Sequence, residues 1–126
     1  MTQFLLDTNV FLWYFWGTKR IDSIKQLIES DDTEVFVSSI SFWEIAIKLR
    51  SGKLEVNLET LHSHVEEHGF VELPITGRYM KAYLELPDLH KDPFDHMLLA
   101  QAIYSPMRLI TGNSFLAEYS SLVMVV

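Results

Sequence analysis

The amino-acid sequence predicts one three-layered α/β domain, in which a short, mostly parallel sheet of four to five strands is flanked by helices. The 126 residues fall within the usual size range of one compact domain. Hydrophobic residues make up 48% of the chain, which is enough for one continuous core. Short apolar runs alternate with longer stretches of helical spacing, and no repeat or Pro/Gly-rich linker interrupts them. Residues 1–126 are therefore expected to form a single domain.

The strands of this sheet are predicted from short apolar runs that show no helical period. Runs of this length, bounded by turn residues, are typical of buried strands. They are Gln3–Leu6, Glu34–Val37, Phe70–Leu73, Met107–Ile110 and Leu122–Val126.

The helices are predicted from the longer stretches between these runs, where apolar residues recur at helical spacing. They are Ile21–Glu29, Ser41–Arg50, Leu58–His68, Gly77–Leu86, Pro93–Tyr104 and Ser114–Tyr119. Right-handed crossovers place such helices over both faces of a parallel sheet and bring the carboxyl ends of the strands to one edge. Ligands bind along that edge in open parallel sheets.

Four polar residues are predicted to meet at this edge. Asp7 directly follows the first strand, and Asn113 lies just past the strand Met107–Ile110. Glu44 lies near the start of the helix after the second strand, and Asp95 lies in the first turn of the helix that leads into Met107–Ile110. Because these positions are scattered along the sequence, their convergence is more informative than any one of them.

Carboxylates held this close together favour a divalent metal ion. They repel one another and raise each other's pKa unless cations neutralise them. Magnesium and manganese prefer oxygen ligands, usually a few carboxylates together with water and substrate phosphate. Such a site supplies the chemistry of phosphodiester hydrolysis without a protein nucleophile. The sequence therefore predicts a Mg²⁺ or Mn²⁺ site that works on phosphodiesters.

Helix capping is the alternative explanation for each acid taken alone. Ser41 and Glu44 have the spacing of a capping box, and Asp92 is expected to cap a helix that has Asp95 in its first turn. Asp7 has no capping box of its own, although an Asx-turn to Asn9 is an option. Only the joint pattern therefore indicates catalysis.

Composition and charge narrow the class of protein. The chain has no cysteine, which suits a reducing cytoplasm and leaves oxygen and imidazole as metal ligands. A net charge of −7 argues against an open basic nucleic-acid groove but fits a site that holds cations. The apolar opening has no basic leader and carries Asp7 in its middle, so neither a signal peptide nor a membrane span is expected. A soluble, cytoplasmic protein is the expectation.

Motifs along nearly the whole chain resemble the PIN-domain ribonucleases, and specifically the VapC-type toxins of bacterial toxin-antitoxin pairs. The stretch His90–Ala102 carries the most recognisable motif. The other matching segments are Phe4–Trp13, Ser41–Lys48 with Gly52–Leu54, Leu73–Thr76 with Leu86–Pro87, and Leu109–Asn113 with Leu116 and Tyr119.

The resemblance implies a PIN-like fold and a Mg²⁺- or Mn²⁺-dependent endoribonuclease with Asp7, Glu44 and Asp95 as metal ligands. It also implies a homodimer that cleaves RNA and is neutralised by a VapB-type antitoxin laid across a groove near the acids. Two positions depart from the family pattern. Asn113 stands where a fourth acid is usual and is expected to be a weak ligand or to position water. His96 stands where an arginine is common.

Three further features have more than one interpretation. Val10–Trp16 is almost wholly apolar and is either core or a partner surface. His64 and His68 have the spacing of a zinc pair, but lack a third ligand at suitable spacing, so a solvated helix face is favoured. The basic run of Lys48, Arg50 and Lys53 either holds RNA phosphates or ends a solvated helix.

Two alternative functions stay open on the sequence. In the first, the missing fourth acid has cost the chain its turnover, and it acts mainly as a module that binds an antitoxin and regulates its operon. In the second, Asp7 is the covalent nucleophile of a phosphatase. The usual second acid of such an enzyme, two residues on, is Asn9 in this chain.

Overall fold

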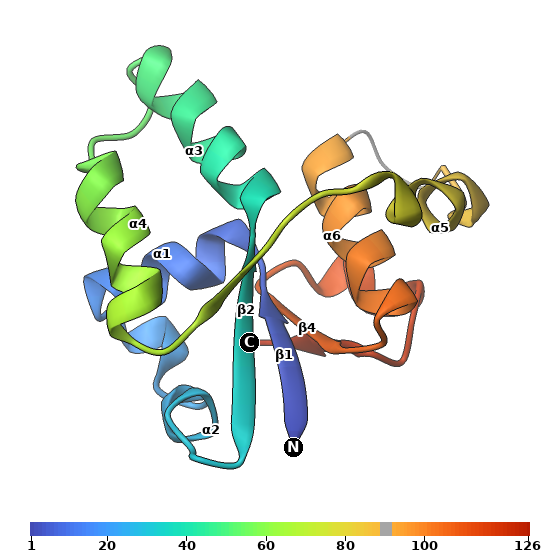
Figure 1. Ribbon diagram of the computed structural model, residues 1–126, viewed down its shortest axis with the longest axis horizontal. Helices are drawn as coiled ribbons and strands as arrows, with labels where there is room; N and C mark the ends of the chain where they lie inside the picture. The colour runs from blue at the N-terminus through green and yellow to red at the C-terminus, as the bar shows by residue number, and fades with distance from the viewer. Residues whose placement is uncertain (89–91) are drawn as a thin grey trace.

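A five-stranded, wholly parallel sheet forms the middle layer of the computed structural model, which describes residues 1–88 and 92–126 (Figure 1). All five predicted strands are observed, with both ends within one residue of the expected ones. They are β1 (Thr2–Leu6), β2 (Thr33–Ser38), β3 (Val71–Leu73), β4 (Arg108–Thr111) and β5 (Val123–Val125). The α/β fold class is thus confirmed.

Alternate residues of the central strands enter two separate hydrophobic clusters, one on each face of the sheet. Phe4 and Leu6 of β1 belong to one cluster, and Leu5 between them belongs to the other. The same alternation divides Val37 from Phe36 in β2, because successive side chains of a strand point to opposite faces. Both faces are apolar, which is why the strands appear in the sequence as unbroken apolar runs.

Helices cover both faces of the sheet and complete the three layers. In Figure 1, α1 (Thr8–Trp16), α2 (Lys25–Ile28) and α4 (Leu58–Glu67) lie to one side of the strands. The other side carries α5 (Met80–Glu85) and α6 (Pro93–Tyr104). Between them, α3 (Ser39–Arg50) contributes Ile45 to one cluster and Ile40 to the other. Within the described residues, none of the helices has the length and apolarity needed to span a bilayer.

Three short 3₁₀ helices account for most differences from the predicted helices. They are η1 (Lys19–Ile21), η2 (Gly77–Tyr79) and η3 (Ser114–Glu118). The predicted helix Ile21–Glu29 is broken into η1, a turn and α2. Ile21, Ile24 and Ile28 still reach the core at helical spacing, so the sequence pattern looks like that of a continuous helix. The predicted helix Ser114–Tyr119 is likewise a 3₁₀ segment.

The helix α1 was not predicted, and it alters the interpretation of the segment Val10–Trp16. That segment lies within α1, and Val10, Phe11 and Leu12 are buried in the core. Trp16, at 47%, is its one strongly exposed aromatic. The partner-surface interpretation is therefore wrong for most of the segment, and core packing explains it.

The order of the strands opens the site edge beside β1. The sheet runs β3-β2-β1-β4-β5, so the chain moves outward from β1 to β3 and then continues on the other side of β1. Neighbouring connections leave β1 and β4 in opposite directions, which creates a crevice at their carboxyl ends. Asp7 follows β1 and Gly112 follows β4, on either side of this switch point. Residues His90 and Lys91, which begin the most recognisable motif, lie outside the described residues.

Candidate active site

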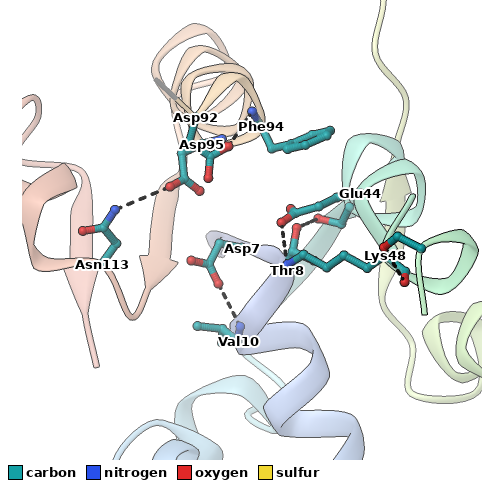
Figure 2. A network of polar contacts seen from close by, with 11 residues as sticks. Asp7, Thr8, Val10, Glu44, Lys48, Asp92, Phe94, Asp95 and Asn113 are labelled. Atoms are coloured by element: carbon teal, nitrogen blue, oxygen red, sulfur yellow. Dashed lines mark hydrogen bonds and ion pairs between the residues drawn. The ribbon is translucent and has the colours of Figure 1, made fainter. Parts of the chain in front are cut away.

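Asp7 is anchored at the junction between β1 and α1, where it is the N-cap of the helix (Figure 2). One carboxylate oxygen accepts a hydrogen bond from the Val10 amide at 2.8 Å, and the other accepts from the Thr111 hydroxyl at 2.5 Å. The backbone amide of Asp7 donates to the Ile110 carbonyl at 3.0 Å. Its side chain is therefore fixed by the start of α1 and by the end of β4, and only 3% of the residue is exposed.

Glu44 reaches the same edge from the second turn of α3 and has no part in capping that helix. The cap is Ser38, whose hydroxyl accepts from the Ile40 amide at 3.1 Å, so α3 begins directly after β2. Ser41 is buried inside the helix and accepts a hydrogen bond from Thr8 at 2.9 Å, which joins α1 to α3. The predicted capping box is therefore wrong. Glu44 instead pairs with Lys48 at 3.0 Å.

The start of α6 brings the third carboxylate to this edge. Asp92 caps the helix by accepting from the amides of Phe94 and Asp95 at 2.9 and 3.3 Å, as predicted. With capping done by Asp92, the carboxylate of Asp95 turns toward Asn113, whose side-chain nitrogen lies 3.5 Å from it (Figure 2).

Asn113 presents its nitrogen to the acids, because its oxygen is used elsewhere. The side-chain oxygen caps η3 by accepting from the Phe115 amide at 3.1 Å. An amide that accepts through oxygen offers a donor on its other arm. The geometry therefore favours a role for Asn113 in orienting Asp95. The role of weak metal ligand, expected from the sequence, is less well supported by it.

All four residues line one open pocket of about 450 Å³ at the switch point. Figure 2 shows the carboxylates of Asp7, Glu44 and Asp95 arriving from different elements around a shared space. The remaining lining residues are Thr8, Asn9, Trp13, Arg20, Asp92 and Gly112. The predicted convergence is therefore present in the fold.

The pocket holds more negative charge than its surroundings neutralise. Burial raises the pKa of the Asp7 carboxyl above its usual range, and Glu44 adds to the effect against the hydrogen bonds from Thr111 and Val10. Burial raises the pKa of Asp95 to about 7, with further contributions from Asp92 and Asp7, against the hydrogen bond from Asn113. Carboxylates in this state gain most from a cation that replaces the lost water.

Two pocket residues were not found by sequence reasoning. The Arg20 guanidinium lies 4.0 Å from the centre of the Trp13 ring, so the two form a stacked cation–π pair at the pocket. Gly112 lies beside the same ring, and a Cβ added there would come within 2.5 Å of it. Nothing in the local pattern marked Arg20 or Trp13, since α1 and η1 bring them to the acids only through the fold.

Several other candidates lie away from the pocket. His96, at the position where an arginine is common in the family, is buried with its ring near Tyr83 and does not line the pocket. Of the basic run, Lys48 pairs with Glu44 while Arg50 and Lys53 are exposed, and none of the three lines the pocket. The solvated-helix interpretation therefore fits Arg50 and Lys53 best.

A potential third ligand, which the sequence spacing did not indicate, lies beside the histidine pair. Glu67 lies with His64 and His68 on α4 and at its end, and one donor atom from each of the three lies within 4.8 Å of the others. This cluster borders a different pocket from the acids.

Comparison with protein families decides the membership of this chain. The family model of the PIN domain matches residues 4–121. The chain belongs to the PIN domain family. Membership in this family supports nuclease, and hence hydrolase, activity. No curated protein matches the chain in sequence.

Solved structures with the same fold include several toxin–antitoxin complexes. VapBC2 from Rickettsia felis, bound to a DNA fragment from its promoter, has a TM-score of 0.74 and 15% identity, over 99% of this PIN domain and 98% of that chain. DNA-bound VapBC from Salmonella typhimurium has a TM-score of 0.69 and 18% identity, over 100% of this PIN domain and 98% of that chain. A toxin–antitoxin complex from Klebsiella pneumoniae has a TM-score of 0.68 and 18% identity, over 96% of this PIN domain and 95% of that chain. At these identities the likeness is one of fold.

Proposed function

We propose that this PIN domain is a Mg²⁺- or Mn²⁺-dependent endoribonuclease toxin that a cognate VapB-type antitoxin neutralises. The observation that carries the proposal is the meeting of Asp7, Glu44 and Asp95 in one pocket at the switch point of the sheet. The three carboxylates come from three elements, and two of them have raised pKa values, so placing them together destabilises the folded state. A bound cation would offset this cost, which indicates that the arrangement serves to bind one.

The donor set fits a hard divalent ion. Asp7, Glu44 and Asp95 would hold it, because carboxylate oxygens are the ligands that Mg²⁺ and Mn²⁺ prefer. When bound, such an ion activates water and stabilises charge on a phosphodiester that is being cleaved. Val10 and Thr111 hold Asp7 in a single orientation, and Asn113 orients Asp95. These contacts keep the carboxylates in place before any ligand arrives.

RNA is the substrate class that the pocket wall supports. The Arg20 guanidinium can meet a phosphate while it stays stacked on Trp13, and arginine suits both contacts. Trp13 is half-buried but lines the pocket. An aromatic ring beside a cation is a common platform for single-stranded nucleic acid. The proposal therefore assigns Arg20 and Trp13 to binding RNA next to the acids.

An antitoxin is the protein partner that the exposed apolar residues near the acids support. Trp43 on α3 is 60% exposed, and its ring contacts Phe94 of α6 at 5.6 Å. The two helices that carry Glu44 and Asp95 thus share an apolar ridge beside the pocket. Structures of the same fold are complexes of toxins with antitoxins.

Exposed Leu84 and Tyr104, on α5 and α6, support a homodimer as part of the proposal. The absence of cysteine suits action in the cytoplasm.

Cleavage of RNA by purified, antitoxin-free protein tests the catalytic part of the proposal. Wild-type protein with Mg²⁺ or Mn²⁺ is expected to cut RNA, whereas Asp7→Asn, which keeps a capping oxygen, is expected not to. Several unrelated RNAs should be tried, since substrate choice is open. The proposal fails if wild type and Asp7→Asn treat every RNA alike while both are folded by circular dichroism.

A binding module without turnover is the second candidate, and the geometry of Asn113 favours it. The fourth family acid is absent, and the oxygen that replaces it caps η3. In this case the chain mainly holds an antitoxin that regulates the operon, as the promoter-bound complex of Rickettsia felis suggests. Calorimetric titration with Mn²⁺ separates the candidates. Binding that Asp95→Ala abolishes supports the enzyme, and antitoxin binding without metal binding supports the module.

The phosphatase alternative gains no support. Asn9 stands where such an enzyme has its second acid, and its side-chain amide cannot act as that acid.

A further inference from the structure

A second group of potential metal ligands lies at the carboxyl end of α4. His64 and Glu67 are in the last turns of the helix, and His68 is its C-cap. Residues three and four apart share one face of a helix, so the three side chains emerge together. The rings of His64 and His68 lie 3.7 Å apart between centroids.

The hydrogen bonding of both histidines leaves ring nitrogens available to a ligand. Nδ1 of His68 lies 3.1 Å from the carbonyl oxygen of His64. Because a carbonyl only accepts, Nδ1 carries the proton and Nε2 of the neutral ring keeps its lone pair. Backbone contacts of this kind commonly orient metal-binding histidines. Nε2 of His64 is buried and has no hydrogen-bond partner among the described residues.

A pocket of about 240 Å³ adjoins the two histidines and gives a ligand room to enter. Its wall comes from the end of α1, from η1 and from α2, and includes the acids Asp22 and Glu29 together with the cation Lys25. The buried hydroxyl of Thr18 in the same wall also has no partner among the described residues. The surroundings therefore favour a small cation and offer polar atoms to its bound water.

We propose that His64, Glu67 and His68 form a site for a divalent transition-metal ion of the zinc class, separate from the acidic pocket. Two imidazoles and one carboxylate are a frequent protein donor set for zinc, with a fourth position left to water. Donors around such an ion lie roughly 3.3 Å apart. The three donor atoms here lie within 4.8 Å of one another, and Glu67 and His68 are exposed, so rotation of their side chains closes the difference.

The chemistry of the donors distinguishes this site from the acidic pocket. Imidazole suits Zn²⁺, Ni²⁺ and Cu²⁺, whereas carboxylates and water suit Mg²⁺ and Mn²⁺. The proposal does not rest on nuclease activity, because all three ligands come from α4 and its cap. A metal bound across positions i, i+3 and i+4 also ties down the last turn of the helix.

Calorimetric titration of untagged, full-length protein with ZnCl₂ tests the proposal. To remove the competing acids, the titration uses the Asp7→Asn/Asp95→Asn double variant as background. About one equivalent of Zn²⁺ is expected to bind there and to raise Tm. Adding His68→Gln is expected to weaken binding at least tenfold, and Glu67→Gln, at a second exposed position, serves if the first variant does not fold.

His62→Gln provides a matched control. His62 is on the same helix, but its ring pairs with Glu72 at 2.7 Å, and it is not in the cluster. Zn²⁺ binding is expected to survive this change, and MgCl₂ at the same concentration is expected not to bind. The proposal is overturned if no Zn²⁺ binds in the background variant. It is also overturned if His68→Gln or Glu67→Gln binds as tightly as the background, or if Mg²⁺ binds equally well.

Discussion

The acidic pocket and the histidine cluster are two groupings of potential metal ligands that the chain assembles in opposite ways. Asp7, Glu44 and Asp95 come from three elements and meet only at the switch point of the sheet. His64, Glu67 and His68 come from a single helix and its cap. The first depends on the whole topology, and the second on the pitch of one helix.

The two sites also differ in the contacts that hold their side chains in place. The acidic pocket is fixed by long-range contacts, such as the hydrogen bond from Thr111 to Asp7 and that from Thr8 to Ser41. The histidine cluster is partly exposed, and the hydrogen bonds within it run from the backbone amide and Nδ1 of His68 to the His64 carbonyl. Disturbing the packing between elements is therefore expected to harm the first and spare the second.

The largest effect is expected from Asp7→Asn. Loss of a central carboxylate is expected to lower the rate of RNA cleavage at least about 100-fold, comparable to removing a main electrostatic group from an active site. The folded state should persist, since asparagine also caps helices and burying it avoids burying a charge. The measurement is single-turnover cleavage with Mn²⁺, alongside Tm. His68→Gln is the matched variant from the other cluster, and cleavage by it should equal wild type. Equal losses in both would erase the distinction between the two clusters.

Gly112→Ala probes the packing that supports the acidic pocket. The added Cβ would meet the Trp13 ring at 2.5 and 2.9 Å, so either the ring or the strand end must shift. The free energy of unfolding is expected to fall by about 1–3 kcal/mol, as for other overpacked positions. Urea unfolding measures it. Gly77→Ala is the control, because no atom lies within 4 Å of the Cβ position there. If both variants unfold alike, the contact with Trp13 carries no weight.

Arg20→Gln tests the proposed contact with RNA. Removal of the guanidinium is expected to weaken RNA binding about tenfold, equivalent to one charge-assisted hydrogen bond of roughly 1.5 kcal/mol. Filter binding to a short RNA at fixed salt measures the loss. Lys19→Gln removes the same charge from the neighbouring position of η1, which does not line the pocket. A similar loss in Lys19→Gln would show that only overall charge matters.

The pH dependence of stability gives the smallest effect. Without metal, Asp95 holds its proton in the folded state up to about pH 7, whereas the unfolded chain loses it near 3.8. The folded state thus binds more protons in this window, and the free energy of unfolding falls as pH rises through it. Above about pH 7 this group causes no further change.

Thermal unfolding in a chelating buffer measures this dependence. Asp95→Asn is expected to flatten the decline in Tm between about pH 4 and 7. Exposed Asp31, changed to asparagine, is the control and is expected to leave the slope unchanged. Parallel curves for wild type and Asp95→Asn would show that the burial of Asp95 does not destabilise the fold.

The sheet could be predicted from the sequence because its strands are buried on both faces. Val35, Phe36 and Val37 illustrate this, since all three are buried although they face opposite layers. The same property hid α1, because Val10–Leu12 is apolar at consecutive positions and shows no helical period. Hydrophobic periodicity does not reveal a helix where consecutive residues are all buried.

The candidate site was predicted in position but not in local detail. Strand ends and helix starts were sufficient to bring Asp7, Glu44 and Asp95 to one edge. The cap at Asp92 was predicted correctly. The capping box at Glu44 was wrong because α3 begins at Ser39, earlier than expected, and the cap at Asp7 was missed because α1 was not predicted. Arg20 could not be found, since its place depends on how η1 packs against Trp13.

The pairing of β1 with β4 has a consequence for the synthesis of the protein. Thr111, which holds Asp7, follows it by 104 residues, so the ribosome must make that whole stretch before the two can meet. A nascent chain that ends before Arg108 lacks β4, one of the two strands beside β1, and the pocket wall at Gly112. The acidic pocket is therefore incomplete until this stretch of the chain has been made. Under the proposed function, an antitoxin that binds before β4 docks would meet the toxin before the pocket can act on RNA.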